Sequence, residues 1–155
     1  NMIMGELHDE LKVKGAELLL EVIEDIEAGK AQPEKQSEEE ATYASLLKRE
    51  MERIDWSKAA VDIHTLIRGF NPAPGAFTKL PDGKNLKIWG SRLTDKATTA
   101  EPGTVVEATK HSFFVACGSG VLELSEVQPE SKKRMAAQVF INGRGVQVGD
   151  VLGKE

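Results

Sequence analysis

The stretch VACGSGVLELSEVQPESKKRM, residues 115–135, decides the fold class of this chain. Apolar and polar side chains alternate over 121–127, as in a strand with one buried face, and Gly-Ser-Gly at 118–120 predicts a hairpin turn before it. Pro129 ends the strand, and three consecutive cations follow at 132–134. A small β-barrel with a strand that ends in three cations is suited to hold a polyanion, and nucleic acid is the leading candidate.

Further short strands are expected around this segment. Asp82-Gly83 is a strong hairpin signal, and turn residues separate the other alternating stretches. The expected fold is mainly β with flanking helices: a small OB-like (oligonucleotide-binding) Greek-key β-barrel, preceded by a long amphipathic helix and a linker. The expected strands span 76–80, 86–93, 104–108, 113–116 and 121–127, followed by a short helix at 136–141 and a last strand at 146–152.

A long amphipathic helix is predicted over residues 5–28. Its apolar residues recur at helical spacing from Leu7 to Ile26, and Gly29 is the expected C-cap. An apolar stripe of this length is unfavourable in water, so the helix either packs on the barrel or has a partner that this chain lacks. The charged sequence KAQPEKQSEEE at 30–40 has the composition of an exposed linker.

A second, shorter helix is expected to begin at Ser57, a favourable N-cap residue. It should end near Gly69, because the sequence NPAPG at 71–75 forbids further helix and forces a rigid turn. One face of this helix carries the residues expected to pack inward, Ala60, Ile63, His64 and Ile67.

The formal charge of −5 hides an asymmetry along the chain. Residues 1–46 hold 12 acids and 4 bases, a net charge of −8, whereas residues 47–155 hold 13 acids and 16 bases, a net charge of +3. This asymmetry favours a nucleic-acid-binding face on the second part. No apolar run could span a membrane, and the N-terminus is unlike a signal peptide. The single cysteine, Cys117, excludes an internal disulfide and fits a reducing cytosol, so a cytoplasmic protein is expected.

No self-sufficient catalytic site is evident in the sequence. Phosphate-loop, HExxH and paired CxxC motifs are absent, and neither a catalytic residue nor a metal site is expected. His64 and Cys117 are expected to pack in the interior. Of the adjacent Phe113 and Phe114, at most one can face outward to stack on a base, because neighbouring strand residues face opposite sides.

Basic side chains are the stronger functional signal. Their contacts to phosphates carry no sequence information, so the expected binding is electrostatic, weakly sequence-selective and sensitive to salt. The competing interpretation is that these residues only keep the protein soluble. The candidate nucleic-acid-binding residues are Lys48, Arg49, Lys84, Lys87, Lys110, Lys132, Lys133 and Arg134, with the groups at 48–49 and 132–134 as the expected principal contacts.

Four segments together resemble the C-terminal region of the methionyl-tRNA formyltransferase family. They are IDWSKAAVDIHTLIRGFNPAPGAF (54–77), LKIW (86–89), PGTV (102–105) and ACGSGVLELSEVQPESKKRM (116–135). Segment 7–29 is similar to the helix that closes the N-terminal formyltransferase domain of that family. Three residues depart from the family pattern: Ala73 replaces a frequent aromatic, Ser131 replaces the usual Gly, and Ala136 replaces a Ser that often caps the next helix.

The resemblance implies an enzyme of translation initiation, which transfers a formyl group from 10-formyltetrahydrofolate to the amino group of initiator methionyl-tRNA. In the family, the Asn-His-Asp catalytic residues and the folate pocket belong to the N-terminal domain, whose HxSLLPxYRG and DxGxxxG motifs this sequence lacks. A fragment that binds no cofactor and is inactive alone is therefore expected. Its expected parts are 1–29, the terminal helix of a truncated Rossmann-like domain; 30–47, a linker; and 48–155, an OB-like tRNA-binding barrel domain.

Two alternatives remain open at this point. The domain could belong to a related sugar-nucleotide formyltransferase, in which the acceptor is another amine. It could also be a non-catalytic interaction or dimerisation module, in which the helix at 7–28 pairs with a second copy.

Overall fold

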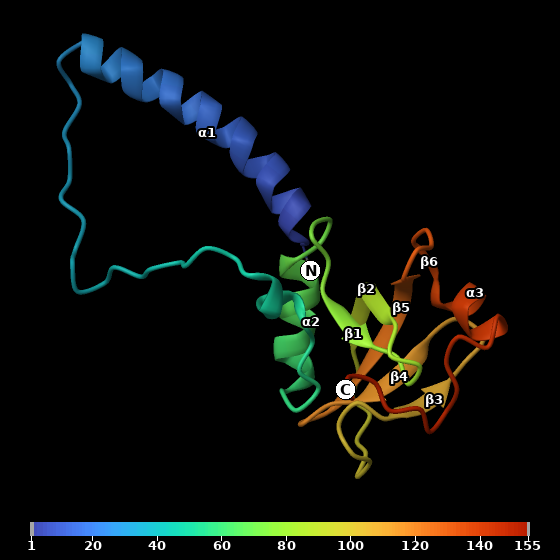
Figure 1. Cartoon of the computed structure of the whole chain (residues 1–155). Coiled ribbons are helices and arrows are strands. Elements are labelled where there is room, and N and C mark those ends of the chain that lie inside the picture. Colours follow the sequence, from blue (N-terminus) through green and yellow to red (C-terminus); the bar gives the residue numbers. More distant parts are fainter. Residues whose placement is uncertain (1, 155) are drawn as a thin grey trace.

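Residues 2–154 are described by a computed structural model, in which a long helix projects from an antiparallel half-barrel (Figure 1). The helices are α1 (Met4–Glu27), α2 (Ala60–Gly69) and α3 (Ala137–Asn142), with a 3-10 helix η1 (Arg49–Glu52). The strands are β1 (Phe77–Lys79), β2 (Asn85–Leu93), β3 (Val105–Ala108), β4 (Phe113–Ala116), β5 (Val121–Pro129) and β6 (Met135–Ala136). No helix within residues 2–154 has the length and apolar character needed to cross a membrane.

The sheet has the strand order β1-β2-β5-β4-β3, and the short β6 pairs with β5. All of these pairings are antiparallel. β3, β4 and β5 follow one another as neighbours, whereas β2 lies beside β5 and reaches β3 through a long connection, which is a Greek key. The predicted fold class is therefore confirmed, with β1 and β3 as the two ends of the strand order in a half-barrel.

The apolar core lies between the sheet and the helices α2 and α3. The predicted alternation in β5 is confirmed, because Leu122 and Leu124 are fully buried whereas Ser125 is exposed. The predicted inward face of α2 is confirmed as well, since all four of its residues are buried: Ala60, Ile63, His64 and Ile67.

The predicted N-cap of α2 at Ser57 is wrong, because the helix begins after Ala59. Ser57 instead donates two hydrogen bonds to Asp55 Oδ1, from its backbone N at 3.0 Å and from its Oγ at 2.6 Å. The amide of Gly118 meanwhile binds the carbonyls of Trp56 and Lys58, at 2.8 and 2.9 Å. These bonds hold the residues before α2 to the β4–β5 hairpin, so the helix begins only after Ala59.

The strand predicted at 146–152 does not form. Asp150 closes a turn instead, because its Oδ2 accepts a hydrogen bond from Gln147 N at 2.8 Å and its own N–H donates to Gln147 O at 3.1 Å. Gly149, with a φ of +94°, provides the left-handed backbone that this turn needs. The segment still pairs with the edge of the sheet, through a bridge between Thr104 and Val151 and through backbone hydrogen bonds of 2.8 Å that join residues 149, 150 and 152 to Val105 and Gly103.

Helix α1 contacts the half-barrel domain only at its first turn, where Gly5 N donates to Asn71 O at 3.1 Å, and the rest of the helix projects away; none of its residues is buried. The apolar stripe itself does not pack on the barrel, because its side chains are exposed, with Leu18 59% accessible. Its predicted end at Gly29 is confirmed by a Schellman motif, in which Gly29 N donates to Ile26 O and Lys30 N donates to Asp25 O. The linker at 30–47 then returns the chain to η1 (Figure 1).

Core and α1 substitutions should separate the stability of the half-barrel from that of the projecting helix. Ile63→Ala removes buried volume and should lower the free energy of unfolding by about 2–5 kcal/mol. Leu18→Glu changes an exposed position of α1 and should alter the half-barrel transition by less than about 0.5 kcal/mol. Urea unfolding followed by tryptophan fluorescence measures both, and a large loss in the Leu18 variant would contradict the exposed position of α1.

Gly118 should tolerate no side chain. A Cβ atom at this position would collide with the carbonyl oxygen of Ser57, and this backbone contact joins the hairpin to the entry of α2. Gly118→Ala should therefore lower the free energy of unfolding by about 3 kcal/mol. Gly69→Ala is the matched control, because a Cβ there meets no atom within 4 Å, and it should be neutral or stabilise by up to about 1 kcal/mol. Equal stability of the two variants would contradict this account.

Candidate nucleic-acid interface

Trp89 is the centre of a cluster on the outer side of β2. Leu86 and Ile88 point into the core, so that Lys87 and Trp89 point outward. The register to β5 shifts after Ile88, which places Trp89 at a β-bulge. The indole is only 8% exposed, although it lies outside the main apolar core, because its ring packs directly against Gly75.

Two cations flank the Trp89 ring. The guanidinium carbon of Arg134 lies 4.9 Å from the ring centroid, and Lys87 Nζ lies 5.8 Å from it. Arg134 Nη2 also forms an ion pair with Glu126 Oε2 at 2.6 Å, and Lys87 Nζ donates to the Pro74 carbonyl at 2.6 Å. Both cations are therefore fixed by an aromatic face and by an oxygen acceptor.

Lys84 and Lys132 line one groove of about 500 Å³ beside this cluster. Hydrogen bonding to Asp82 raises the pKa of Lys84, and its Nζ lies 2.7 Å from Asp82 Oδ2. All three lysines are exposed, but Lys132 and Lys133 differ from Lys84 in that no carboxylate within residues 2–154 pairs with either. These two lysines are the cations of the cluster that are free to contact a phosphate.

The remaining candidate residues lie elsewhere on the molecule. Lys48 and Arg49 are exposed where the chain enters η1, and Figure 1 shows this segment on the α2 side, away from the β5–β6 loop. Lys110 is exposed in the β3–β4 turn. The structure thus brings Lys84, Lys87, Lys132, Lys133 and Arg134 into one region, and it does not bring Lys48, Arg49 or Lys110 into it.

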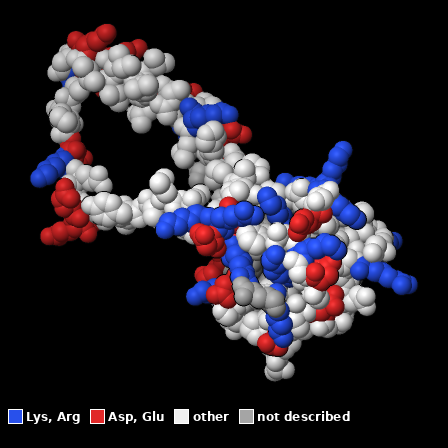
Figure 2. Space-filling model, viewed as in Figure 1, with Lys and Arg blue, Asp and Glu red and all other residues white. Residues whose placement is uncertain are grey.

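The charge distribution follows the asymmetry of the sequence. Figure 2 shows lysine and arginine side chains over the half-barrel with acidic groups between them, whereas acidic side chains gather at the far end of α1 and on the linker. Glu126 neutralises the charge of Arg134. The unpaired positive charge of the cluster is therefore that of Lys132 and Lys133 in the β5–β6 loop.

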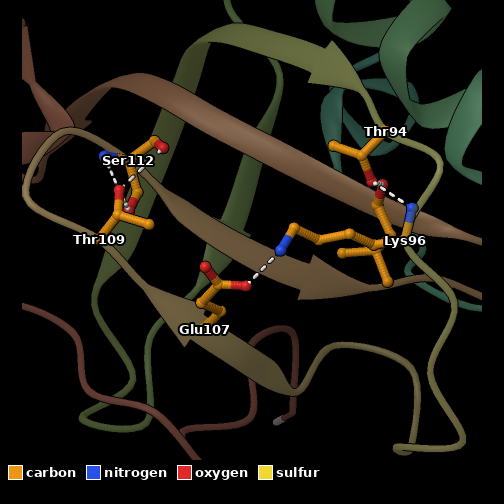
Figure 3. Close-up of polar contacts among 6 residues, drawn as sticks. Thr94, Lys96, Glu107, Thr109 and Ser112 are labelled. Carbon is orange, nitrogen blue, oxygen red and sulfur yellow. Dashed lines mark hydrogen bonds and ion pairs between the residues drawn. The ribbon is translucent and has the colours of Figure 1, made fainter.

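Neither adjacent phenylalanine offers a stacking platform. Phe113 is fully buried and Phe114 is 7% exposed, so neither ring is open to a base, which agrees with the expectation that at most one would be. Lys96 covers the ring of Phe114, with Nζ 4.8 Å from its centroid, and forms an ion pair with Glu107 at 2.6 Å (Figure 3). The hydroxyl of Thr94 donates to Val121 O at 2.7 Å and holds the start of this covering loop.

Two residues with reactive side chains are packed away from solvent, as expected. Burial raises the pKa of the Cys117 thiol to about 11, so the thiolate is scarce at neutral pH. Burial lowers the pKa of His64, which shares a hydrogen bond of 2.9 Å with Ser91 Oγ. Within residues 2–154, no group of three His, Cys, Asp or Glu side chains could hold a metal ion.

Sequence reasoning missed Trp89 as the organising residue. The available signal was its position two residues after Lys87, which puts both on one face of the strand. The approach of Arg134, which lies just before β6, could not be predicted from local pattern, because it depends on the pairing of β6 with β5.

Solved structures with a similar fold include variants of HypX from Aquifex aeolicus. One superimposes with a TM-score of 0.61 at 20% sequence identity, covering 85% of this chain and 24% of that chain. A structure of HypX in complex with tetrahydrofolic acid has a TM-score of 0.58 at 20% identity and covers 80% of this chain and 22% of that one. At this level of identity the likeness shows the fold alone.

Curated relatives are much more similar in sequence. The methionyl-tRNA formyltransferase of Bacillus subtilis is 50% identical over 151 residues, 97% of this chain and 47% of the relative. That of Symbiobacterium thermophilum is 50% identical over 94% of this chain and 45% of the relative, and that of Clostridium novyi is 40% identical over 98% and 49%. The chain thus spans about half the length of the curated relatives it matches.

The family described as "Formyl transferase, C-terminal domain" matches residues 46–145, which include the half-barrel strands and the whole Trp89 cluster. Together with the relatives, this match confirms the resemblance to the C-terminal part of methionyl-tRNA formyltransferase that the sequence motifs indicated. The chain therefore belongs to the formyl transferase C-terminal domain family.

Proposed function

We propose that this chain is the tRNA-binding part of a methionyl-tRNA formyltransferase that acts in translation initiation in the cytoplasm. The observation that carries the proposal is the exposed, unpaired state of Lys132 and Lys133, beside Arg134, within the residues that match the family. Cations without carboxylate partners can neutralise phosphates without first breaking an ion pair. The half-barrel would thereby hold the backbone of the initiator methionyl-tRNA.

We propose that formyl transfer itself uses groups outside residues 2–154. The methionyl amine must lose a proton as its nitrogen attacks the formyl carbon of 10-formyltetrahydrofolate, so a base must lie within hydrogen-bond reach of that amine. His64 is buried and bonded to Ser91, and Cys117 is buried as a thiol. We therefore assign the chemistry and the folate site to a separate domain of the enzyme, for which the greater length of the relatives leaves room.

The proposed binding is mainly electrostatic. Contacts to the phosphate backbone position a nucleic acid without identifying its bases. Selection of the initiator tRNA would then depend on its shape and on the geometry of the complete enzyme. We further propose that Lys48 and Arg49, at η1, and Lys110, in the β3–β4 turn, extend the contact surface beyond the Trp89 cluster, because a ligand as large as tRNA can reach separate parts of the half-barrel.

Helix α1 has a different proposed role. Its apolar side chains are more than 40% exposed at Leu11, Leu18 and Ile26, and an apolar face of this size on a soluble protein marks a contact surface. We assign this face to the domain that carries out formyl transfer. Pairing with a second copy of the chain is the alternative, and a concentration-dependent dimer would indicate it.

The salt dependence of the affinity for tRNA should report the number of phosphate contacts. Affinity for tRNA should fall about tenfold or more between 50 and 200 mM salt, because each contact contributes about 0.9 to the slope of log K against log salt. The double variant Lys132→Ala/Lys133→Ala should reduce this slope by about 1.8. Fluorescence anisotropy with labelled tRNA measures both quantities.

The matched control is Lys12→Ala/Lys14→Ala, which removes the same charge from α1, where both lysines pair with acids. Its slope should equal that of the wild type. Wild-type affinity that does not respond to salt would contradict the proposed function, and so would equal slopes for the two double variants.

The chain alone should not formylate. When it is incubated with initiator methionyl-tRNA and 10-formyltetrahydrofolate, no formylmethionyl-tRNA should accumulate, because the proposal places the base for the amine outside residues 2–154. Acid-gel separation of the tRNA species makes the measurement, with a complete methionyl-tRNA formyltransferase as the positive control. Formylation by the chain itself would contradict the assignment of the chemistry to another domain.

A further inference from the structure

The side chain of Gln128 connects Trp89 to the basic loop. The indole Nε1–H of Trp89 donates to Gln128 Oε1 at 3.1 Å, and Gln128 Nε2 donates to the backbone carbonyl of Lys132 at 2.9 Å. One amide therefore links the outer face of β2 to the main chain between β5 and β6. The loop is also closed from within, because Lys132 N donates to Pro129 O at 3.0 Å.

Arg134 holds the other end of the same loop. Its guanidinium stacks over Trp89 and pairs with Glu126, so its aromatic and anionic contacts are already made inside the protein. Ser131 takes a φ of +60°, a left-handed conformation that residues other than Gly rarely adopt. A backbone in this conformation needs contacts that hold it. Gln128 supplies one at the carbonyl of Lys132, between the two free lysines, and Arg134 supplies another after them.

We infer that the three consecutive cations have two different roles. Arg134, together with Trp89 and Gln128, is a positioning group that fixes the shape of the 130–134 loop, and Lys132 and Lys133 are the residues that contact phosphate. The inference rests on the proposed function for the phosphate contacts. The positioning of the loop can be measured without any nucleic acid.

A 130–134 loop whose shape is fixed before tRNA binds should bind tRNA more tightly than a mobile one. Lysine side chains on a mobile loop must be ordered when the ligand binds, and this ordering reduces affinity. Loss of the Gln128 bridge should therefore weaken binding while the number of phosphate contacts stays constant. Loss of Lys133 should change that number.

Gln128→Met tests the bridge, because it keeps the length of the side chain and removes both hydrogen bonds. Hydrogen exchange of the Lys132 amide should accelerate roughly threefold to tenfold, the change expected for one or two lost hydrogen bonds. Affinity for tRNA should fall by a similar factor with an unchanged salt slope. Gln138→Met on α3 is the matched control, since no hydrogen bond of its side chain is found within residues 2–154, and it should change neither quantity.

Arg134→Met and Lys133→Met separate positioning from contact, because each removes one positive charge from the same loop. Lys133→Met should lower the salt slope by about 0.9, whereas Arg134→Met should leave the slope unchanged and lower the affinity. A slope that falls equally in both variants would show that Arg134 contacts phosphate and would overturn the division of roles.

The two proposals fail in distinguishable ways. If wild-type protein does not bind tRNA, the proposed function fails, and the Lys132 exchange rate alone then decides whether Gln128 positions the loop. An exchange rate in Gln128→Met equal to that of the wild type would overturn the positioning role, whatever the affinity for tRNA.

Discussion

The pairing of β2 with β5 is the constraint on which the rest of the half-barrel depends. Its register runs from Leu86 opposite Pro129 to Leu93 opposite Leu122. One face of this ladder is core, and the other carries the Trp89 cluster. A shift of one residue would turn every side chain of β2 to the opposite face, so the same register determines both the packing and the candidate interface.

The exposed cations and the exposed apolar side chains lie in separate parts of the molecule. The half-barrel buries its apolar side chains between sheet and helices and presents cations at the β5–β6 loop, whereas α1 exposes an apolar stripe beside acidic groups. The proposed partners of these two surfaces differ in chemistry accordingly, a polyanion for the cations and an apolar protein face for α1. Membership of the formyl transferase C-terminal domain family gives both surfaces a place in one proposed enzyme.

Local pattern predicted those elements that depend on neighbouring residues. The β1–β2 hairpin follows from Asp82-Gly83, and the end of α1 follows from Gly29, because each needs only the chain around it. The start of α2 was mispredicted since Gly118, far along the sequence, binds the carbonyls that precede it. The covering of Phe114 by Lys96 is likewise a contact between separate segments, and so is the approach of Arg134 to Trp89. The candidate cations could therefore be named from the sequence, but their grouping could not.

The most direct test of the account is to map where tRNA touches the chain, by recording the amide and indole NMR signals of labelled protein during a titration with tRNA. The account predicts that the largest shifts occur at residues 131–134 and at the Trp89 indole N–H, with the signals of α1 unchanged. Shifts confined to α1, with residues 131–134 unaffected, would contradict it.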